Sequence, residues 1–245
     1  MVNNREMLRP YSRLSRVYDR GWGDFSIQYV NLIEELLAER GIKRARVLDI
    51  ACGTGILALA LAKNGHTVQG ADISPEMIKA AKSKAAGLNN ITFAVRDMAG
   101  FTCKNKLDMV TCTYDSINYL RKKHDVRRML SSVAAALDEK GLFIFDSNTK
   151  YLYLEHRNEM HKREINGEQF LQRCDYTVRE NTAVTTFSFS DGTYDIHRQR
   201  PYGYEELLPL LEKAGLRTLN LFSWFEGLPY TTNTPKFFCV AEKHG

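Results

Sequence analysis

The stretch VLDIACGTGILALA, residues 47–60, decides the fold of this chain. It begins with a short apolar and β-branched run, passes through a turn with two glycines, and continues as a segment rich in alanine and leucine. This order predicts a buried strand over residues 45–51 and a helix over residues 56–65. Gly53 and Gly55 allow a ligand to approach the backbone closely, and a helix that begins there presents unpaired N–H groups. The stretch therefore predicts a ligand site at the end of a strand.

Strands and helices alternate around this stretch. Residues 11–40 are expected to be helical, with Gly41 ending the helix. Ser74 and Pro75 predict the N-cap and the first position of a helix that runs to about Gly87. Such alternation predicts a doubly wound, Rossmann-like α/β sheet of about seven strands. The remaining expected elements of this half are a helix at 125–137 and strands at 66–73, 90–97, 107–114 and 141–148.

The pattern changes in the second half of the chain. Residues 151–200 contain alternating apolar and polar runs typical of antiparallel strands, with Asp191-Gly192 predicting a hairpin turn. We therefore expect a single α/β domain, formed by residues 1–150 and 201–245, that is interrupted by an inserted antiparallel β layer. After the insertion the domain is expected to resume with a helix at 205–215 and strands near 217–225 and 236–243.

The charge of the chain is concentrated in two basic segments. The net charge is +5, from 34 basic and 29 acidic residues. Residues 1–20 carry +3 and residues 121–128 carry +4, so the rest of the chain carries −2. This modest total argues against a dedicated DNA-binding protein. The spacing of the arginines in the first segment predicts a stripe along one face of a helix. This stripe either faces solvent or attracts an anionic substrate or an RNA backbone. Its members are Arg5, Arg9, Arg13, Arg16 and Arg20.

The cysteines and the apolar runs indicate where the protein works. The five cysteines are widely spaced and form no zinc-binding pattern, which fits a reducing cytoplasm. The N-terminus has no apolar core like that of a secretory signal, and no run of about 18 apolar residues occurs. We therefore expect a cytoplasmic protein, a monomer or a homodimer, with no metal site and no membrane partner.

Two acidic residues near the glycine turn narrow the choice of ligand. Asp72 ends the next expected strand, about 20 residues on, where a carboxylate can accept both hydroxyls of a ribose. Residues 53–58 also fit the GxGxxA fingerprint, so an NAD(P)-dependent oxidoreductase is one alternative. Asp49 lies in the strand before the turn, where it would repel a pyrophosphate and favour a cationic ligand end such as an ammonium or a sulfonium.

Further stretches follow in a fixed order along the chain. They are GADISPEMI (70–78), VRDM (95–98), CTYDSINYL (112–120), GLFIFD (141–146), EELLPLLEKAGL and KFFCVAEK. Together with VLDIACGTG they resemble the class I S-adenosylmethionine-dependent methyltransferases, over nearly the whole chain outside the insertion. The resemblance implies a sheet whose last strand is antiparallel, S-adenosyl-L-methionine as cofactor and S-adenosyl-L-homocysteine as product.

The resemblance also assigns residues to the parts of the cofactor. Asp49 matches the acid at the methionine end, Asp72 the acceptor for the ribose hydroxyls, and Asp97 the acid near the adenine amine. Ile73 matches the apolar residue against adenine, and Met98 supplies a backbone contact. The full predicted cofactor set is Asp49, Ala51, Gly53, Gly55, Asp72, Ile73, Met77, Asp97, Met98 and Thr113, with Tyr11 and Trp22 from the N-terminal segment.

Methyl transfer is an in-line displacement that mainly requires a positioned nucleophile and, for an amine, a base. We predict Asp115, Tyr119 and Tyr18 as catalytic residues, with loop capping and ordinary packing as the alternative. In the small-molecule N-methyltransferases that the chain resembles, a histidine often occupies the position of Tyr119. Residues 1–25 resemble the tyrosine-bearing lid of these enzymes, and residues 151–200 are expected to cover the substrate site.

The sequence thus predicts an enzyme that methylates a small molecule, at nitrogen by resemblance. An RNA-directed methyltransferase and a non-catalytic protein that binds S-adenosylmethionine are further alternatives, but no aromatic RNA-binding motif accompanies the basic run at 121–128. That run is expected at the rim of the site, where an anionic substrate is a hypothesis. Candidates for the roof of the substrate site are Phe187, Phe189, Tyr194, His197 and Arg200.

Overall fold

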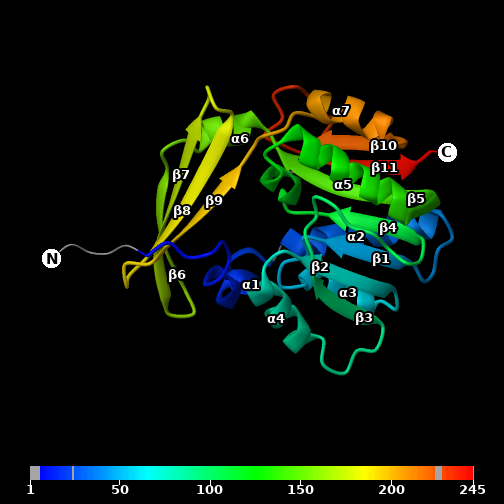
Figure 1. Cartoon of the computed structure of the whole chain (residues 1–245), viewed down its shortest axis with the longest axis horizontal. Coiled ribbons are helices and arrows are strands. Elements are labelled where there is room, and N and C mark those ends of the chain that lie inside the picture. The colour runs from blue at the N-terminus through cyan, green and yellow to red at the C-terminus, as the bar shows by residue number, and fades with distance from the viewer. Residues whose placement is uncertain (1–5, 24, 224–227, 245) are drawn as a thin grey trace.

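A computed structural model of the chain describes residues 6–23, 25–223 and 228–244. Figure 1 shows two sheets: a large one flanked by helices and a smaller one standing beside it, with the N-terminal segment passing close to the smaller sheet. Within the described part of the chain, no helix is long and apolar enough to cross a membrane.

The large sheet has seven strands in the order β10-β11-β5-β4-β1-β2-β3. The five strands from β1 to β5 are parallel, while β11 pairs antiparallel with both β5 and β10. The predicted seven-stranded α/β sheet with an antiparallel last strand is therefore confirmed. Its strands are β1 (Arg46–Ile50), β2 (Thr67–Asp72), β3 (Ile91–Val95), β4 (Leu107–Cys112), β5 (Leu137–Asn148), β10 (Leu216–Ser223) and β11 (Lys236–Lys243).

Helices bury both faces of this sheet. Along β1, Val47 packs on one face while Leu48 and Ile50 pack on the other, because successive side chains of a strand point to opposite sides. The Val47 face is covered by α2 (Phe25–Glu39), α3 (Ile56–Lys63) and α4 (Pro75–Lys84). The opposite face is covered by α5 (Lys123–Ala136) and α7 (Tyr204–Lys213).

Several predicted helix ends are confirmed by the backbone. The Ser74 side chain accepts a hydrogen bond from the Met77 N–H (3.2 Å) at the start of α4. Gly41 and Gly65 adopt positive φ angles of 67° and 95°, as expected after a helix. The expected strand at 141–148 starts earlier, at Leu137, directly after α5. The end of the strand expected near 217–225 lies outside the described residues.

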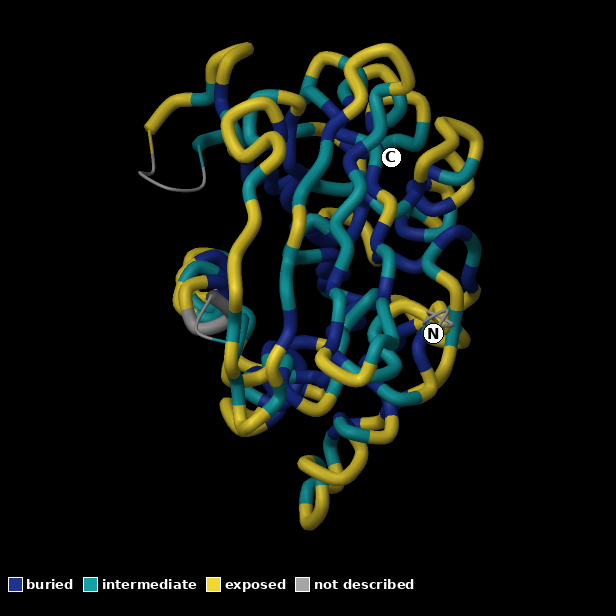
Figure 2. Tube along the Cα trace, turned by 90° about the vertical axis from the view of Figure 1, so that its left-hand side faces the viewer, coloured by how far each residue is buried: buried dark blue, intermediate teal, exposed yellow. Residues whose placement is uncertain are grey.

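The insertion forms a separate antiparallel sheet of four strands in the order β6-β7-β8-β9. The Asp191-Gly192 hairpin lies between β8 and β9 as predicted, but the first residues of the expected layer form helix α6 (Lys150–Glu155), capped by Thr149. Figure 2 views the molecule from the side of this sheet, whose strands mix buried, intermediate and exposed residues. The four strands are β6 (Met160–Ile165), β7 (Glu168–Thr177), β8 (Thr182–Phe189) and β9 (Tyr194–Gln199).

The single helix expected over residues 11–40 is wrong. Tyr11 has a φ of 66°, and the segment divides into a 3-10 turn (Leu14–Arg16), α1 (Tyr18–Trp22) and α2. The reason is tertiary: Leu14 and Val17 are buried against the inserted sheet, which a continuous helix along α2 would not allow. The contiguous arginine stripe is lost with the helix, and its first member, Arg5, lies outside the described residues.

Candidate functional site

A cavity of about 680 Å³ opens at the carboxyl ends of the parallel strands β1, β2 and β4. The chain turns there on residues with positive φ angles, Ala51 (58°), Gly53 (54°) and Gly55 (79°). A Cβ on Gly53 would have the Tyr18 ring as its nearest neighbour, at 3.9 Å, so this glycine leaves the cavity wall open. The turn therefore brings backbone to the cavity surface.

Gly55 has a different part in the turn. A Cβ at this position would lie 2.7 Å from the Phe93 ring and 3.1 Å from the Ala81 methyl group. Gly55 thus lets α3 pack closely on β3 and α4, and it is absent from the cavity wall. Its predicted contact with the cofactor stays a prediction, and its observed contribution is to the packing behind the turn.

Asp72 fixes the glycine turn from the end of β2. Its carboxylate accepts hydrogen bonds from the N–H groups of Gly53 (2.9 Å) and Ser74 (2.8 Å), one on each oxygen. Each oxygen keeps a further lone pair, so the carboxylate can still accept two hydroxyl groups. Burial raises the pKa of Asp72 above its usual value. Next to it, Ile73 leaves 67% of its surface exposed while lining the cavity, which provides an apolar platform.

Asp49 places a second carboxylate in the cavity wall. It is only 2% exposed, and its Oδ1 accepts a hydrogen bond from the Thr111 hydroxyl at 2.8 Å. Burial raises the pKa of Asp49 to about 7. A cationic ligand end placed beside it would favour the ionised form, so this wall is complementary to an ammonium or a sulfonium.

The opposite end of the cavity combines polar and basic side chains. Asp97 accepts a hydrogen bond from the Ala99 N–H at 2.8 Å, and Met98 lies between them in the wall. Asp125 and Arg128, from the basic run at 121–128, also line the cavity. Of the run expected at the rim of the site, these two residues reach the cavity wall.

Five aromatic residues from the N-terminal segment and from the loop after β4 line the cavity: Tyr11, Tyr18, Trp22, Tyr114 and Tyr119. Tyr18 stacks on Trp22 with ring centroids 5.6 Å apart, and its ring lies 6.3 Å from that of Tyr114. The Tyr11 and Tyr119 hydroxyls are 2.5 Å apart. Burial raises the pKa of both, so the two hydroxyls are neutral and can pass a proton along a hydrogen bond.

A buried histidine and aspartate lie behind these tyrosines. The His197 Nδ1 is 2.7 Å from the Tyr119 hydroxyl, and its Nε2 is 3.4 Å from Asp195 Oδ1. The other carboxylate oxygen of Asp195 accepts a hydrogen bond from the Tyr11 N–H at 2.8 Å. The sequence offered His197 only as a roof candidate and missed Asp195. The period of two along β9, which puts both on one face, is the signal that could have linked them.

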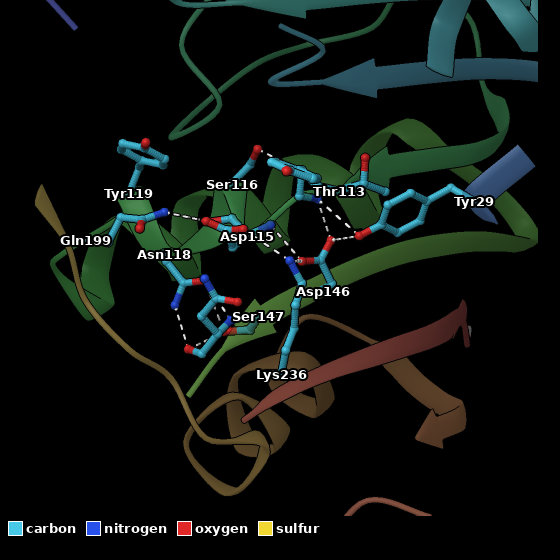
Figure 3. Close-up of polar contacts among 12 residues, drawn as sticks. Tyr29, Thr113, Asp115, Ser116, Asn118, Tyr119, Asp146, Ser147, Gln199 and Lys236 are labelled. Atoms are coloured by element: carbon cyan, nitrogen blue, oxygen red, sulfur yellow. Dashed lines mark hydrogen bonds and ion pairs between the residues drawn. The ribbon is translucent and has the colours of Figure 1, made fainter. Parts of the chain in front are cut away.

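Asp115 does not line the cavity, although the sequence predicts it as catalytic. It is held from behind by Lys236 Nζ (3.1 Å) and Gln199 Nε2 (2.6 Å), as Figure 3 shows. Burial raises its pKa, and the Lys236 ammonium opposes that effect. Both carboxylate oxygens are thus occupied, so Asp115 is built as a positioning residue; its predicted catalytic role stays a prediction.

Asp146, at the end of β5, organises the loop that carries Asp115. It is fully buried and accepts hydrogen bonds from the Tyr29 hydroxyl (2.7 Å) and from the N–H groups of Tyr114 (2.5 Å) and Asp115 (2.6 Å). These two loop residues have positive φ angles of 63° and 50°, a conformation that costs free energy for residues other than glycine. Lys236 completes the cluster 2.8 Å from Asp146. The loop therefore keeps its strained shape because Asp146 holds both N–H groups.

The remaining roof candidates have structural partners. Phe187 and Phe189 pack with Leu14 and Val17 in a buried cluster between the N-terminal segment and the inserted sheet. Tyr194 exchanges backbone hydrogen bonds with residues 6 and 8, at 3.0 and 2.8 Å. Arg200 pairs with Glu206 at 2.9 Å instead of facing the cavity. None of the roof candidates lines the cavity, whereas all the residues predicted to be catalytic or to bind the cofactor do so, apart from Gly55 and Asp115.

Comparison with known proteins agrees with this geometry. Residues 47–141 match a family described as a methyltransferase domain. A putative methyltransferase of Geobacillus sp. (strain WCH70) is 29% identical over 87% of this chain and 91% of its own. A glycine/sarcosine N-methyltransferase of Parasynechococcus marenigrum (strain WH8102) is 28% identical over 90% of this chain and 76% of its own. The crystal structure of an S-adenosylmethionine-dependent methyltransferase from Clostridium acetobutylicum superposes with a TM-score of 0.83, at 24% identity over 96% of this chain and 99% of that one.

Residues 47–141 therefore carry a methyltransferase domain, and the chain as a whole has the fold of the S-adenosylmethionine-dependent methyltransferases. Its cofactor is S-adenosylmethionine, which decides against the NAD(P)-dependent oxidoreductase alternative. The residues present fit this cofactor: Asp72 keeps free lone pairs for hydroxyls, Ile73 exposes an apolar surface, and Asp49 is a buried carboxylate suited to a cationic end. In the described part of the chain, no cluster of His, Cys, Asp or Glu has the composition of a metal site.

Proposed function

We propose that the enzyme methylates a nitrogen atom of a small molecule. The observation that carries this proposal is that the N-terminal segment is fastened to the inserted sheet over the aromatic end of the cavity. Leu14 and Val17 are buried against Phe170, Phe187 and Phe189. A closed aromatic end admits a small acceptor and excludes a folded RNA or a protein surface.

Charged contacts strengthen this closure. Arg13 pairs with Glu168 at 2.7 Å and also with Asp191, and its guanidinium lies 4.3 Å from the centroid of the Phe189 ring. This arginine of the predicted stripe is therefore committed to the inserted sheet and is not free to bind an RNA backbone. We accordingly propose residues 1–25 as a lid and residues 151–200 as the cover of the acceptor site.

The chemistry that the residues support is positioning and proton removal. S-adenosylmethionine supplies an activated methyl group, so the protein mainly has to align the acceptor and exclude water. An amine must reach the reaction in its neutral form. Tyr119, hydrogen-bonded on one side to Tyr11 and on the other to His197, provides a path for that proton to the buried imidazole of His197. The similarity to a glycine/sarcosine N-methyltransferase supports nitrogen as the methylated atom.

We further propose that the protein works in the cytoplasm, since all five cysteines are free thiols. An anionic acceptor stays a hypothesis for this cavity, because its basic residues, Arg9, Arg96 and Arg128, share the wall with the carboxylates of Asp49, Asp72, Glu76, Asp97 and Asp125.

A screen of a metabolite extract with methyl-labelled S-adenosylmethionine tests the proposed activity. Mass spectrometry should find the label on a small molecule, and fragmentation should place it on nitrogen. The Asp72→Ala variant provides the control, because it should bind the cofactor poorly and yield little labelled product. Label that appears only on oxygen, on protein or on RNA would overturn the proposal.

A further inference from the structure

A second cavity, of about 630 Å³, lies on the inner face of the inserted sheet. The strand registers place Gln172 of β7, Thr185 of β8 and Gln199 of β9 on the same face of that sheet. The end of β5 and helix α6 supply the other side through Asn148 and Tyr153. The proposed proton path through Tyr11, Tyr119 and His197 does not use this cavity.

The second cavity adjoins the cofactor cavity at two places. The Arg163 guanidinium, in the wall of the second cavity, lies 4.8 Å from the centroid of the Trp22 ring, which lines the first. Gln199 donates to Asp115 at 2.6 Å, and Asp115 is flanked by Tyr114 and Ser116, both in the wall of the first cavity. Only single side chains therefore separate the two spaces.

Arg163 is a half-buried cation without an anionic partner. Its one hydrogen bond goes to the Gln172 Oε1 at 3.3 Å, and within the described residues no carboxylate lies within 4.0 Å of it. The carboxylate that lines the same cavity, Glu159, is bound by His156 (3.1 Å) and His161 (3.0 Å). The guanidinium consequently keeps most of its five donors for a ligand.

The floor of the cavity offers the complementary hydrogen-bonding group. Asn148 is buried, and its Oδ1 has no hydrogen-bond partner. Its amide nitrogen donates to the Tyr153 hydroxyl at 3.2 Å, and that hydroxyl donates to Gln199 at 2.8 Å. A buried carbonyl oxygen without a donor is costly, so this atom favours a ligand that carries an N–H or O–H group.

We propose that the second cavity binds one end of the methyl acceptor and that Arg163 holds an anionic oxygen group at this end, a carboxylate or a phosphate. Asn148 then accepts a hydrogen bond from a donor on the same molecule. The other, reactive end of the acceptor extends past Trp22 and Tyr114 into the aromatic end of the first cavity, where it meets the cofactor. This inference rests on the proposed function, since it assigns the acceptor site of that same reaction.

Fluorescence titration with acetate and, separately, with inorganic phosphate tests the anion site in protein saturated with S-adenosylhomocysteine. Because Arg163 lies over Trp22, an anion bound to it should change the tryptophan emission. Arg163→Gln should weaken binding about ten- to a hundredfold, the loss expected for charge-assisted hydrogen bonds. Arg163→Lys should bind with intermediate affinity, because it keeps the charge and loses the planar fork. Preference for acetate identifies a carboxylate, and preference for phosphate identifies a phosphate.

Arg173→Gln is the matched control, since Arg173 follows Gln172 on β7, points to the other face and is 53% exposed. It should bind both anions like the native protein, and all three variants should retain their affinity for S-adenosylhomocysteine in calorimetry. Equal binding by the native protein and Arg163→Gln, or no binding of either anion, would overturn the anion site. Failure of the proposed function would appear separately, as a metabolite screen without labelled product while anion binding persists.

Discussion

Replacing Asp49 with asparagine should stabilise the protein without ligand and weaken its binding to the cofactor. Asparagine keeps an oxygen that can accept the hydrogen bond from Thr111, so the change removes the charge and little else. In the native protein this carboxylate is 2% exposed, and burial raises its pKa from 3.8 to about 7. The folded state therefore favours the neutral acid, and ionisation at high pH costs stability.

The size of the effect follows from linkage. Because the folded pKa lies above the unfolded one, the native free energy of unfolding falls as pH rises from about 4 to about 7 and levels off above that. At about 1.36 kcal/mol for each pKa unit, the full loss is on the order of 4 kcal/mol. Of this, about 2.5 kcal/mol is expected between pH 5 and pH 8.

Urea unfolding of the native protein and of Asp49→Asn at pH 5, 6, 7 and 8 measures this difference. The advantage of the variant should grow with pH and reach a plateau near pH 8. Calorimetry with S-adenosylmethionine should show weaker binding by the variant, and the release of a proton by the native protein below pH 7 should be lost. A stability difference that does not change with pH would refute a buried, titrating Asp49.

Three further substitutions test other parts of the site. Asp72→Ala should weaken S-adenosylmethionine binding about ten- to a hundredfold in calorimetry, because two hydroxyl acceptors and the anchor of Gly53 are lost together; unchanged affinity would contradict the ribose assignment. Tyr119→Phe breaks the link to His197 and should lower kcat about a hundredfold while leaving cofactor affinity unchanged, and a normal kcat at saturation would refute the proton path. Leu14→Ala should destabilise the contact between the N-terminal segment and the inserted sheet by about 2–4 kcal/mol and speed proteolysis of that segment, and an unchanged cleavage rate would argue against a docked lid.

The α/β frame and the cofactor end of the site follow from local sequence. The strand that carries Asp49, the glycine turn and the strand end at Asp72 lie within about 25 residues, and their order fixes their geometry. Gly55 illustrates the limit of local sequence. Its position in the turn follows from the glycine pattern, but its contact with Phe93 depends on how α4 and β3 pack. Local sequence therefore predicts the course of the backbone at the site more reliably than it predicts which residues of the turn face the cavity and which face the core.

The acceptor end depends on contacts between distant parts of the chain. Asp115 is neutralised by Lys236, 121 residues further on, which no local pattern around Asp115 indicates. His197 becomes part of the site only because β9 carries it to Tyr119. Likewise, Tyr11 leaves the helical conformation because the N-terminal segment must turn to reach the inserted sheet, so tertiary packing overrides helix propensity there.

A crystal structure of the protein with S-adenosylhomocysteine and acetate tests the arrangement of the two cavities most directly. The predicted arrangement has the ribose hydroxyls on Asp72, the amino group of the ligand beside Asp49, and acetate on Arg163 across the side chains of Trp22 and Tyr114. S-adenosylhomocysteine in the reverse orientation, or acetate bound elsewhere while the second cavity holds only water, would contradict it.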